Sequence, residues 1–165
     1  YCHNPHLLPV RGADELAWAD VLAFLDGRRG LLDGVVFSGG EATLQAALPE
    51  AVREVRALGF RIGLHTAGPY PDRLGAVLPW VDWVGFDVKA PFAEYDRVSG
   101  VPGSGAKALE SLRVVIASGV TVETRTTIDP AFLGDDSVAR LQAELAAMGA
   151  RPSVLQDCRP VPPRP

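Results

Sequence analysis

Residues 82–89, DWVGFDVK, decide the fold, because they form a short apolar strand with charge on one side only. Successive side chains of an extended strand point to opposite faces, so three apolar residues share one face: Val84, Phe86 and Val88. The opposite face carries Asp87 and Lys89, near the carboxyl end of the strand. A strand covered on both sides by helices is nearly all apolar. These two charges therefore need an explanation.

Similar apolar stretches recur along the chain, separated by helical patterns. Strands are expected at residues 34–41, 60–66, 81–91, 120–128 and 151–156. Helices are expected at about 14–25, 43–58, 72–78, 105–119 and 135–149. Pro49 splits the second helix in two, Gly27 and Gly119 follow helix ends, and Asp136 or Ser137 is the expected N-cap of the last helix.

This alternation predicts βα units and a parallel sheet, either an open doubly wound layer or a curved, barrel-like one. The first helix has no strand before it, so a missing first strand just upstream would complete a six-strand repeat. The only methionine is Met148, which also favours a chain truncated at its N-terminus. Residues 1–157 are taken as the core domain, and residues 158–165 as a tail too rich in proline to pack.

Composition limits the classes of function. The 165 residues are 47% hydrophobic and 22% charged, which is typical of a globular protein. The net charge is −4 without a basic run, so neither a nucleic acid nor an anionic membrane is an expected partner. No apolar run has the length of a membrane span and no leader pattern is present, which predicts a cytoplasmic protein.

A second strand also directs charge to one face. In residues 121–128, TVETRTTI, Glu123 and Arg125 lie on the face opposite the apolar one. One interpretation is a set of internal ion pairs, Asp87 with Lys89 or Glu123 with Arg125, because buried charge is costly unless it is paired. The other is a polar cavity for a charged ligand at the carboxyl ends of the strands. We favour the cavity.

Two glycine-containing turns have different expected roles. In SGGEAT, the paired glycines Gly39 and Gly40 either make a tight turn or let the backbone approach a ligand, with Glu41 as an acceptor for an ammonium group. The GSG run at 103–105 follows no strand and is expected to be a plain loop.

The start of the chain, YCHNPH, contains groups that can bind metal. Cys2 with His3 and His6 allows a zinc site, but no second cysteine lies at ligand spacing. Cys158 is expected to be a small buried apolar residue.

The order of the motifs YCHNP, VVFSGGEATLQ, HTAG, VGFDVKAPF..Y, ETRTT and VLQ resembles the radical S-adenosylmethionine superfamily. Within it, the chain is similar to glycyl-radical-enzyme activating proteins, especially the anaerobic ribonucleoside-triphosphate reductase activating type. The resemblance implies an α/β fold, a partial (β/α)6 TIM-like barrel of parallel strands with its first strand missing.

The resemblance also implies a cofactor pair. The family signature C-x-x-x-C-x-aromatic-C holds a [4Fe–4S] cluster with three thiolates, which leaves one iron open for S-adenosylmethionine. Tyr1 matches the aromatic position and Cys2 the third cysteine, so the first two cysteines are expected upstream and the fragment alone is expected to be inactive. An electron from the cluster cleaves S-adenosylmethionine to methionine and a 5′-deoxyadenosyl radical.

Partners follow from the same resemblance. The radical would remove a hydrogen atom from a glycine of a glycyl-radical enzyme, anaerobic ribonucleotide reductase in the activating type. An electron donor such as flavodoxin or ferredoxin would reduce the cluster.

Site residues implied by the resemblance lie at successive strand ends. The turn after the first strand matches the segment that holds the methionyl amino group, and Lys89 of the D-x-K pair suits the methionyl carboxylate. His65 and Ala67, on either side of Thr66, differ from the Asp and Asn often found around the matching threonine in the family. The implied cofactor-binding residues are Tyr1, Ser38, Gly39, Gly40, Glu41, Thr66, Asp87, Lys89, Arg125 and Gln156, with Cys2 as the cluster ligand.

Two alternatives stay open. The first is a radical S-adenosylmethionine enzyme that acts on a small molecule or on another glycyl-radical enzyme, because a fold does not settle a substrate. The second is a non-catalytic βα binding domain whose cysteine motif has decayed.

Overall fold

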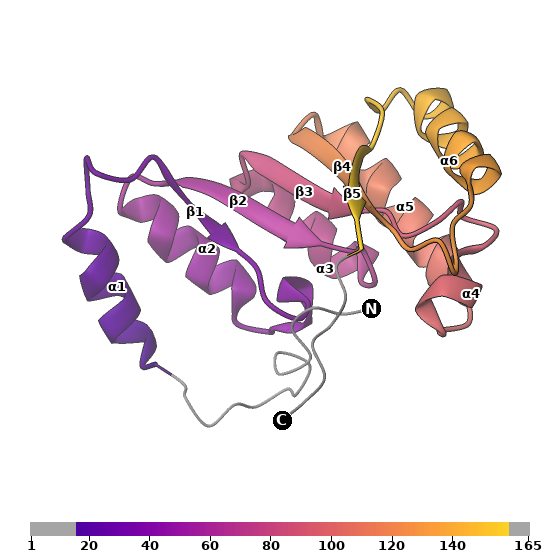
Figure 1. Cartoon of the computed structure of the whole chain (residues 1–165). Coiled ribbons are helices and arrows are strands. Elements are labelled where there is room, and N and C mark those ends of the chain that lie inside the picture. Colours follow the sequence, from indigo (N-terminus) through magenta and orange to yellow (C-terminus); the bar gives the residue numbers. More distant parts are fainter. Residues whose placement is uncertain (1–15, 159–165) are drawn as a thin grey trace.

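The computed structural model describes residues 16–158, which form one α/β unit around a sheet of five parallel strands in the order β1-β2-β3-β4-β5 (Figure 1). The strands are β1 (Gly34–Phe37), β2 (Arg61–Thr66), β3 (Trp83–Asp87), β4 (Thr121–Ile128) and β5 (Val154–Asp157). The predicted strands and their parallel pairing are confirmed. The predictions for Tyr1, Cys2, His3 and His6, and for residues 159–165 of the tail, lie outside the described residues.

Helical segments lead into each strand. The α-helices are α1 (Trp18–Asp26), α2 (Leu48–Ala57), α3 (Pro71–Val77), α4 (Tyr95–Ser99), α5 (Ser104–Ser118) and α6 (Asp135–Ala147). Short 3-10 turns, η2 (Ala42–Leu44) and η3 (Leu78–Trp80), precede α2 and follow α3. The predicted break near Pro49 is confirmed, because Pro49 lies in the first turn of α2, where its missing N–H costs nothing. Helix α4 was not predicted from the sequence.

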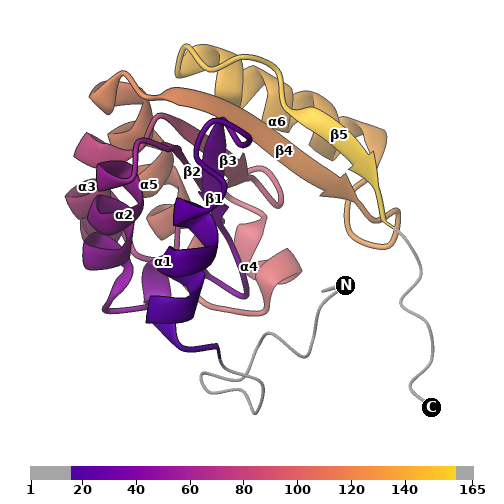
Figure 2. The same ribbon diagram turned by 90° about the vertical axis from the view of Figure 1, so that its left-hand side faces the viewer.

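Helices α2, α3 and α5 cover one face of the curved sheet, and α6 lies at the β4–β5 end (Figures 1 and 2). The core lies between these helices and the alternate strand residues that face them. Ile62, Leu64, Val84 and Phe86 are at most 1% exposed there. Within residues 16–158 the opposite face has no helical cover, and on it Val36 is 49% exposed. This sheet of five parallel strands agrees with the partial TIM-like barrel that the resemblance implied.

The GSG run was predicted to be a plain loop, and that prediction was wrong. Ser104 and Gly105 lie in the first turn of α5, which follows Gly103 at φ +76°. The Asp96 carboxylate accepts hydrogen bonds from the Gly103 N–H (2.7 Å), the Gly105 N–H (3.3 Å) and the Ser104 hydroxyl (3.0 Å). An acidic side chain from α4 thus satisfies the open N–H groups of α5, a contact that local sequence does not reveal.

The N-cap predicted for the last helix was also wrong. Helix α6 begins at Asp135 after Gly134, so Asp136 and Ser137 lie inside its first turn. The Ser137 hydroxyl donates to the Glu94 carboxylate at 3.0 Å instead of capping the helix. Two acidic residues in the first turn complement the partial positive charge of the helix start.

The sequence was predicted to contain no apolar run long enough to span a membrane. Across residues 16–158 no helix combines the length and apolarity that crossing a membrane requires.

Candidate cofactor site

The register of the sheet gathers polar side chains at the carboxyl ends of its strands, on the uncovered face. Asp87 of β3 is paired with Arg125 of β4, and His65 of β2 with Gly85 of β3. Thr127 pairs with Gln156 of β5, which places Gln156 one pleat beyond Arg125 on the same face. Three predicted site residues on three strands therefore share one surface.

The loop after β1 is held to the end of β2 through the Glu41 side chain. Its Oε1 accepts hydrogen bonds from the Thr43 N–H (3.1 Å), the Thr43 hydroxyl (2.5 Å) and the Thr66 hydroxyl (2.8 Å). Its Oε2 accepts one from the Ala67 N–H at 3.0 Å. All four donors are neutral, and Glu41 forms no ion pair with any residue in 16–158. Its negative charge is thus dispersed over hydrogen bonds without being neutralised by a cation.

Thr66 lies on the helix-covered side of β2 and is 3% exposed. Its hydroxyl donates to Glu41 and accepts from the Gly68 N–H at 2.9 Å. Gly68 has φ +72°, and a Cβ there would lie 2.5 Å from the Phe86 ring. Thr66 therefore lies on the buried side of the sheet, where it holds the Glu41 carboxylate and the turn after β2.

An ion pair crosses from β3 to β4. The Arg125 Nε and Nη2 atoms donate to Asp87 Oδ1 at 3.2 and 3.0 Å. The Arg125 side chain is 16% exposed and that of Asp87 is 48% exposed. Internal ion pairing was one of the two interpretations of this face, but the pair joins neighbouring strands and differs from both pairs considered.

His65 extends this pair to the loop after β1. Its Nε2 lies 3.3 Å from Arg125 Nη1, and its Nδ1 lies 3.3 Å from the Ser38 hydroxyl. The imidazole also meets the Trp83 indole edge to face, with ring centroids 5.5 Å apart. Ser38, His65, Arg125 and Asp87 thus form one continuous network across four strand ends.

Gly85 makes room for this network. A Cβ at this position would lie 2.8 Å from His65 Cδ2, 2.8 Å from the Trp83 indole and 2.9 Å from Arg125 Nη2. Such distances are below van der Waals contact, so a side chain at this position would displace the ring or the guanidinium. The absence of a side chain at Gly85 therefore leaves the space that the His65 ring and the Arg125 guanidinium occupy.

The surroundings of His65 lower the pKa of its side chain. Its pKa is lowered from the ordinary 6.5, first because burial disfavours the charged ring and second because of the Arg125 charge. Asp87 and Glu123 act in the opposite direction without reversing the shift. The imidazole is therefore neutral at physiological pH.

The backbone of the D-x-K segment is held by a buried phenol. The Tyr95 hydroxyl donates to the Asp87 carbonyl at 3.2 Å and accepts from the Lys89 N–H at 3.1 Å. Tyr95 is 2% exposed and comes from α4. This contact fixes where the Lys89 side chain leaves the backbone beyond β3.

The remaining predicted residues lie at the rim. Ser38, Gly39 and Gly40 are exposed, and Gly39 has φ +137°, which favours glycine. Gln156 is exposed on β5, and no side-chain hydrogen bond links it to another described site residue. Sequence reasoning treated His65 only as a departure from the family pattern. The period of two in FRIGLHT places it with Gly63 on the face of Asp87, and that signal could have found it.

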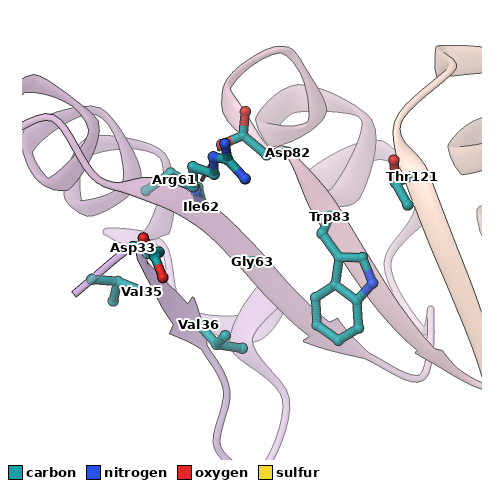
Figure 3. A pocket seen from close by; sticks show the side chains of 10 residues that line it. Asp33, Val35, Val36, Arg61, Ile62, Gly63, Asp82, Trp83 and Thr121 are labelled. Carbon is teal, nitrogen blue, oxygen red and sulfur yellow. Dashed lines mark hydrogen bonds between the residues drawn. The ribbon is translucent and has the colours of Figure 1, made fainter.

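A hollow of about 460 Å³ lies on the same face, at the opposite ends of the strands (Figure 3). Figure 3 shows the Val36 and Trp83 side chains on either side of Gly63. None of the predicted cofactor-binding residues lines it. The predicted cofactor-binding residues that the structure describes therefore lie away from this hollow, at or near the carboxyl ends of the strands.

The donor set fits S-adenosylmethionine. An unneutralised carboxylate and an exposed glycine turn suit an ammonium group, and Lys89 supplies a cation for a carboxylate. Ligands for an iron–sulfur cluster are not found in the described part of the chain, which holds no group of three or more His, Cys, Asp or Glu residues arranged to bind a metal. Tyr1 and Cys2, the residues expected at the cluster, lie outside that part.

Comparisons with known proteins identify the family of this chain. The family model of the Radical SAM superfamily matches residues 1–137. A curated relative, a PqqA peptide cyclase from Xanthomonas euvesicatoria pv. vesicatoria (strain 85-10), is 36% identical over 128 residues. The match covers 73% of this chain and 33% of the relative, so the chain spans about a third of that protein.

Solved structures show the same fold at low identity. Native anSMEcpe with bound AdoMet matches 92% of this chain and 45% of its own, with a TM-score of 0.71 and 13% identity. A domain of pyruvate-formate lyase-activating enzyme from Bacteroides vulgatus ATCC 8482 matches 75% of this chain and 78% of its own, with a TM-score of 0.63 and 16% identity. TYW1 with a lysine-pyruvate adduct bound matches 94% and 58%, with a TM-score of 0.63 and 19% identity.

Proposed function

This chain belongs to the radical S-adenosylmethionine superfamily, and from that premise we propose that the full-length protein binds S-adenosylmethionine at the carboxyl ends of β1–β4 and cleaves it reductively. The observation that carries the proposal is the polar surface formed by Glu41 and by the network of Ser38, His65, Arg125 and Asp87. It lies where parallel α/β folds place their ligands, at the carboxyl ends of the strands.

Glu41 is the proposed partner of the methionyl amino group. Its carboxylate has no cationic partner within residues 16–158, and its Oε2 takes a single hydrogen bond. A carboxylate oxygen has room for more than one donor, so an ammonium group adds a charge-assisted bond without displacing an existing one. The hydrogen bonds to Thr43 and Thr66 keep the group oriented before the ligand arrives.

Lys89 is the proposed partner of the methionyl carboxylate. Asp87, two residues earlier on the same face, forms its ion pair with Arg125, and Lys89 adds an ammonium group just beyond the end of β3. Tyr95 fixes the backbone from which the lysine extends. When bound through Cys2 and two further cysteines, a [4Fe–4S] cluster would supply the electron that cleaves S-adenosylmethionine and yields the 5′-deoxyadenosyl radical.

Exclusion of water is the other task of the chain. The helix-covered side beneath the network is closed by residues at most 1% exposed, among them Leu64, Val84 and Phe86. Water therefore reaches the network from the open side only. A bound cofactor and a substrate would cover that side together, as radical chemistry requires.

The proposed substrate is a glycine residue of a glycyl-radical enzyme, anaerobic ribonucleotide reductase in the first instance, with flavodoxin or ferredoxin as the electron donor. The ordered motifs from YCHNP to VLQ support this assignment. The similarity in fold to a pyruvate-formate lyase-activating domain is consistent with this assignment, but that similarity is evidence for the fold alone.

A second candidate is modification of a peptide. It is favoured by the 36% identity to a PqqA peptide cyclase, a sequence match that covers most of this chain. Both candidates place the radical next to a polypeptide, so they share the open face and differ in what docks there.

The test uses full-length protein, reconstituted anaerobically with iron and sulfide and reduced with dithionite. The first measurement is 5′-deoxyadenosine formed from S-adenosylmethionine, which the proposal requires and a decayed binding domain would not give. The second is electron paramagnetic resonance of a co-expressed glycyl-radical enzyme. A glycyl radical supports activation, whereas a mass change in a small peptide without one supports the second candidate. Cleavage with neither result would refute both assignments.

A further inference from the structure

The hydrogen bonds of His65 determine which ring nitrogen carries the proton. Arg125 is a donor only, so the His65 Nε2 that faces its Nη1 at 3.3 Å must accept. The proton of the neutral ring is then on Nδ1, which donates to the Ser38 hydroxyl at 3.3 Å. The Ser38 hydrogen is left to point away from the ring. Both neighbours of His65 are therefore oriented by one tautomer.

We propose that His65, as the neutral Nδ1–H tautomer, is a positioning residue that orients Arg125 and Ser38 for S-adenosylmethionine, so that its protonation weakens cofactor binding. The inference rests on the proposed function, because it concerns the same site. It assigns a role to a residue that differs from the family pattern.

Protonation would turn Nε2 from an acceptor into a donor. An Nε2–H and an Arg125 N–H would then face each other across 3.3 Å, with a positive charge on both groups. The guanidinium would keep its two bonds to Asp87 Oδ1 and lose the third contact that orients it. At the other end, Ser38 belongs to the loop that precedes Glu41 and is exposed, so the histidine is what holds its hydroxyl.

Charged groups face His65 from two strands. Arg125 and Glu123 come from β4 and Asp87 from β3, whereas Ser38 and Trp83 are uncharged. Burial and the Arg125 charge lower the pKa of His65, and the two carboxylates oppose them in part. Since the folded protein holds the ring neutral, the network is complete at pH values above 6.5. Its contact between His65 and Arg125 is lost as the pH falls through the lowered pKa, whereas Nδ1 keeps its hydrogen and its bond to Ser38.

Two substitutions separate the ends of the network. The carbonyl oxygen of His65→Gln reaches the position of Nε2, so it accepts from Arg125 and does not titrate. The shorter side chain of His65→Asn reaches toward Ser38 but not Arg125. We expect loss of the Arg125 contact to weaken S-adenosylmethionine binding about tenfold, which corresponds to about 1.4 kcal/mol.

The experiment measures the affinity of reconstituted full-length protein for S-adenosylmethionine by calorimetry between pH 5 and 8. Wild type is expected to bind about tenfold more weakly at the acid end. His65→Asn is expected to be about tenfold weaker at every pH. His65→Gln is expected to retain most of the affinity and to lose the acid step, which separates His65 from titration of the ligand or the cluster.

Equal pH profiles for wild type and His65→Gln would overturn the inference and leave the proposed function standing. Absence of binding at every pH in wild type would overturn both. Thermal unfolding without ligand gives a second measurement, because the inference requires the difference in melting temperature between wild type and His65→Gln to change as the pH falls through the His65 pKa. A difference that is constant with pH would also overturn it.

Discussion

Glu41→Ala tests the claim that one carboxylate holds the turn after β1 to the end of β2. The substitution removes an acceptor of four hydrogen bonds. Two donors belong to Thr43 and one to Thr66, and these residues are 1% and 3% exposed, so water does not simply replace the carboxylate. A buried polar group left without its partner costs about 1–3 kcal/mol. Because the donors share one acceptor and relax together, we expect a total loss of about 2–4 kcal/mol in the free energy of unfolding.

The assay is thermal and urea unfolding of the full-length protein without cofactor. A loss of that size corresponds to a decrease in melting temperature of about 4–16 °C for a domain of this length. Glu123→Ala is the matched control, because Glu123 is an exposed carboxylate on the same face of the sheet, and we expect a change within about 0.5 kcal/mol. Equal stabilities for the two variants would refute the anchoring role of Glu41.

Three further predictions concern glycines and the ion pair. Gly68→Ala is expected to lower the free energy of unfolding by about 1–3 kcal/mol more than Gly30→Ala, measured with urea, because both have positive φ but only Gly68 faces a clash with Phe86. Gly85→Ala is expected to weaken S-adenosylmethionine binding about tenfold in calorimetry, because its Cβ would displace the Arg125 guanidinium that makes a charged hydrogen bond. Asp87→Asn is expected to lower the pKa of His65 further, so the acid step in the binding profile moves to lower pH. Equal losses in the free energy of unfolding for Gly68→Ala and Gly30→Ala would contradict the first prediction. An unchanged affinity of Gly85→Ala would contradict the second, and an acid step at the wild-type pH in Asp87→Asn would contradict the third.

Local pattern was enough to predict the strands and the face on which charge lies. The period of two in DWVGFDVK and TVETRTTI placed Asp87 and Arg125 on the uncovered face, and the register confirms it. Pattern could not say that these two side chains pair with each other, because the pairing depends on the alignment of strands 38 residues apart. The interpretation of an internal ion pair is therefore right in kind but not in its partners, and the polar cavity stays a prediction.

The features that were not predicted from the sequence share a cause. Asp96 satisfies the start of α5, and Glu94 accepts a hydrogen bond from Ser137. Asp96 lies in α4 and Glu94 directly before it, and this five-residue helix has too few residues to show a helical period. His65 was passed over because its partners lie on β4 and on the loop after β1, far away in sequence. The face on which such a side chain lies can be predicted from the period of its strand, but its non-local partners are visible only once the sheet is assembled.

The central claim is that the carboxyl ends of these strands bind S-adenosylmethionine for reductive cleavage. The most direct test is the yield of 5′-deoxyadenosine from reduced, reconstituted full-length protein carrying Lys89→Glu, compared with Lys107→Glu. Lys107 is the other lysine of the chain and is exposed on α5, away from the site. We predict that Lys89→Glu abolishes the product and that Lys107→Glu yields as much as wild type. Undiminished product from Lys89→Glu would contradict the account.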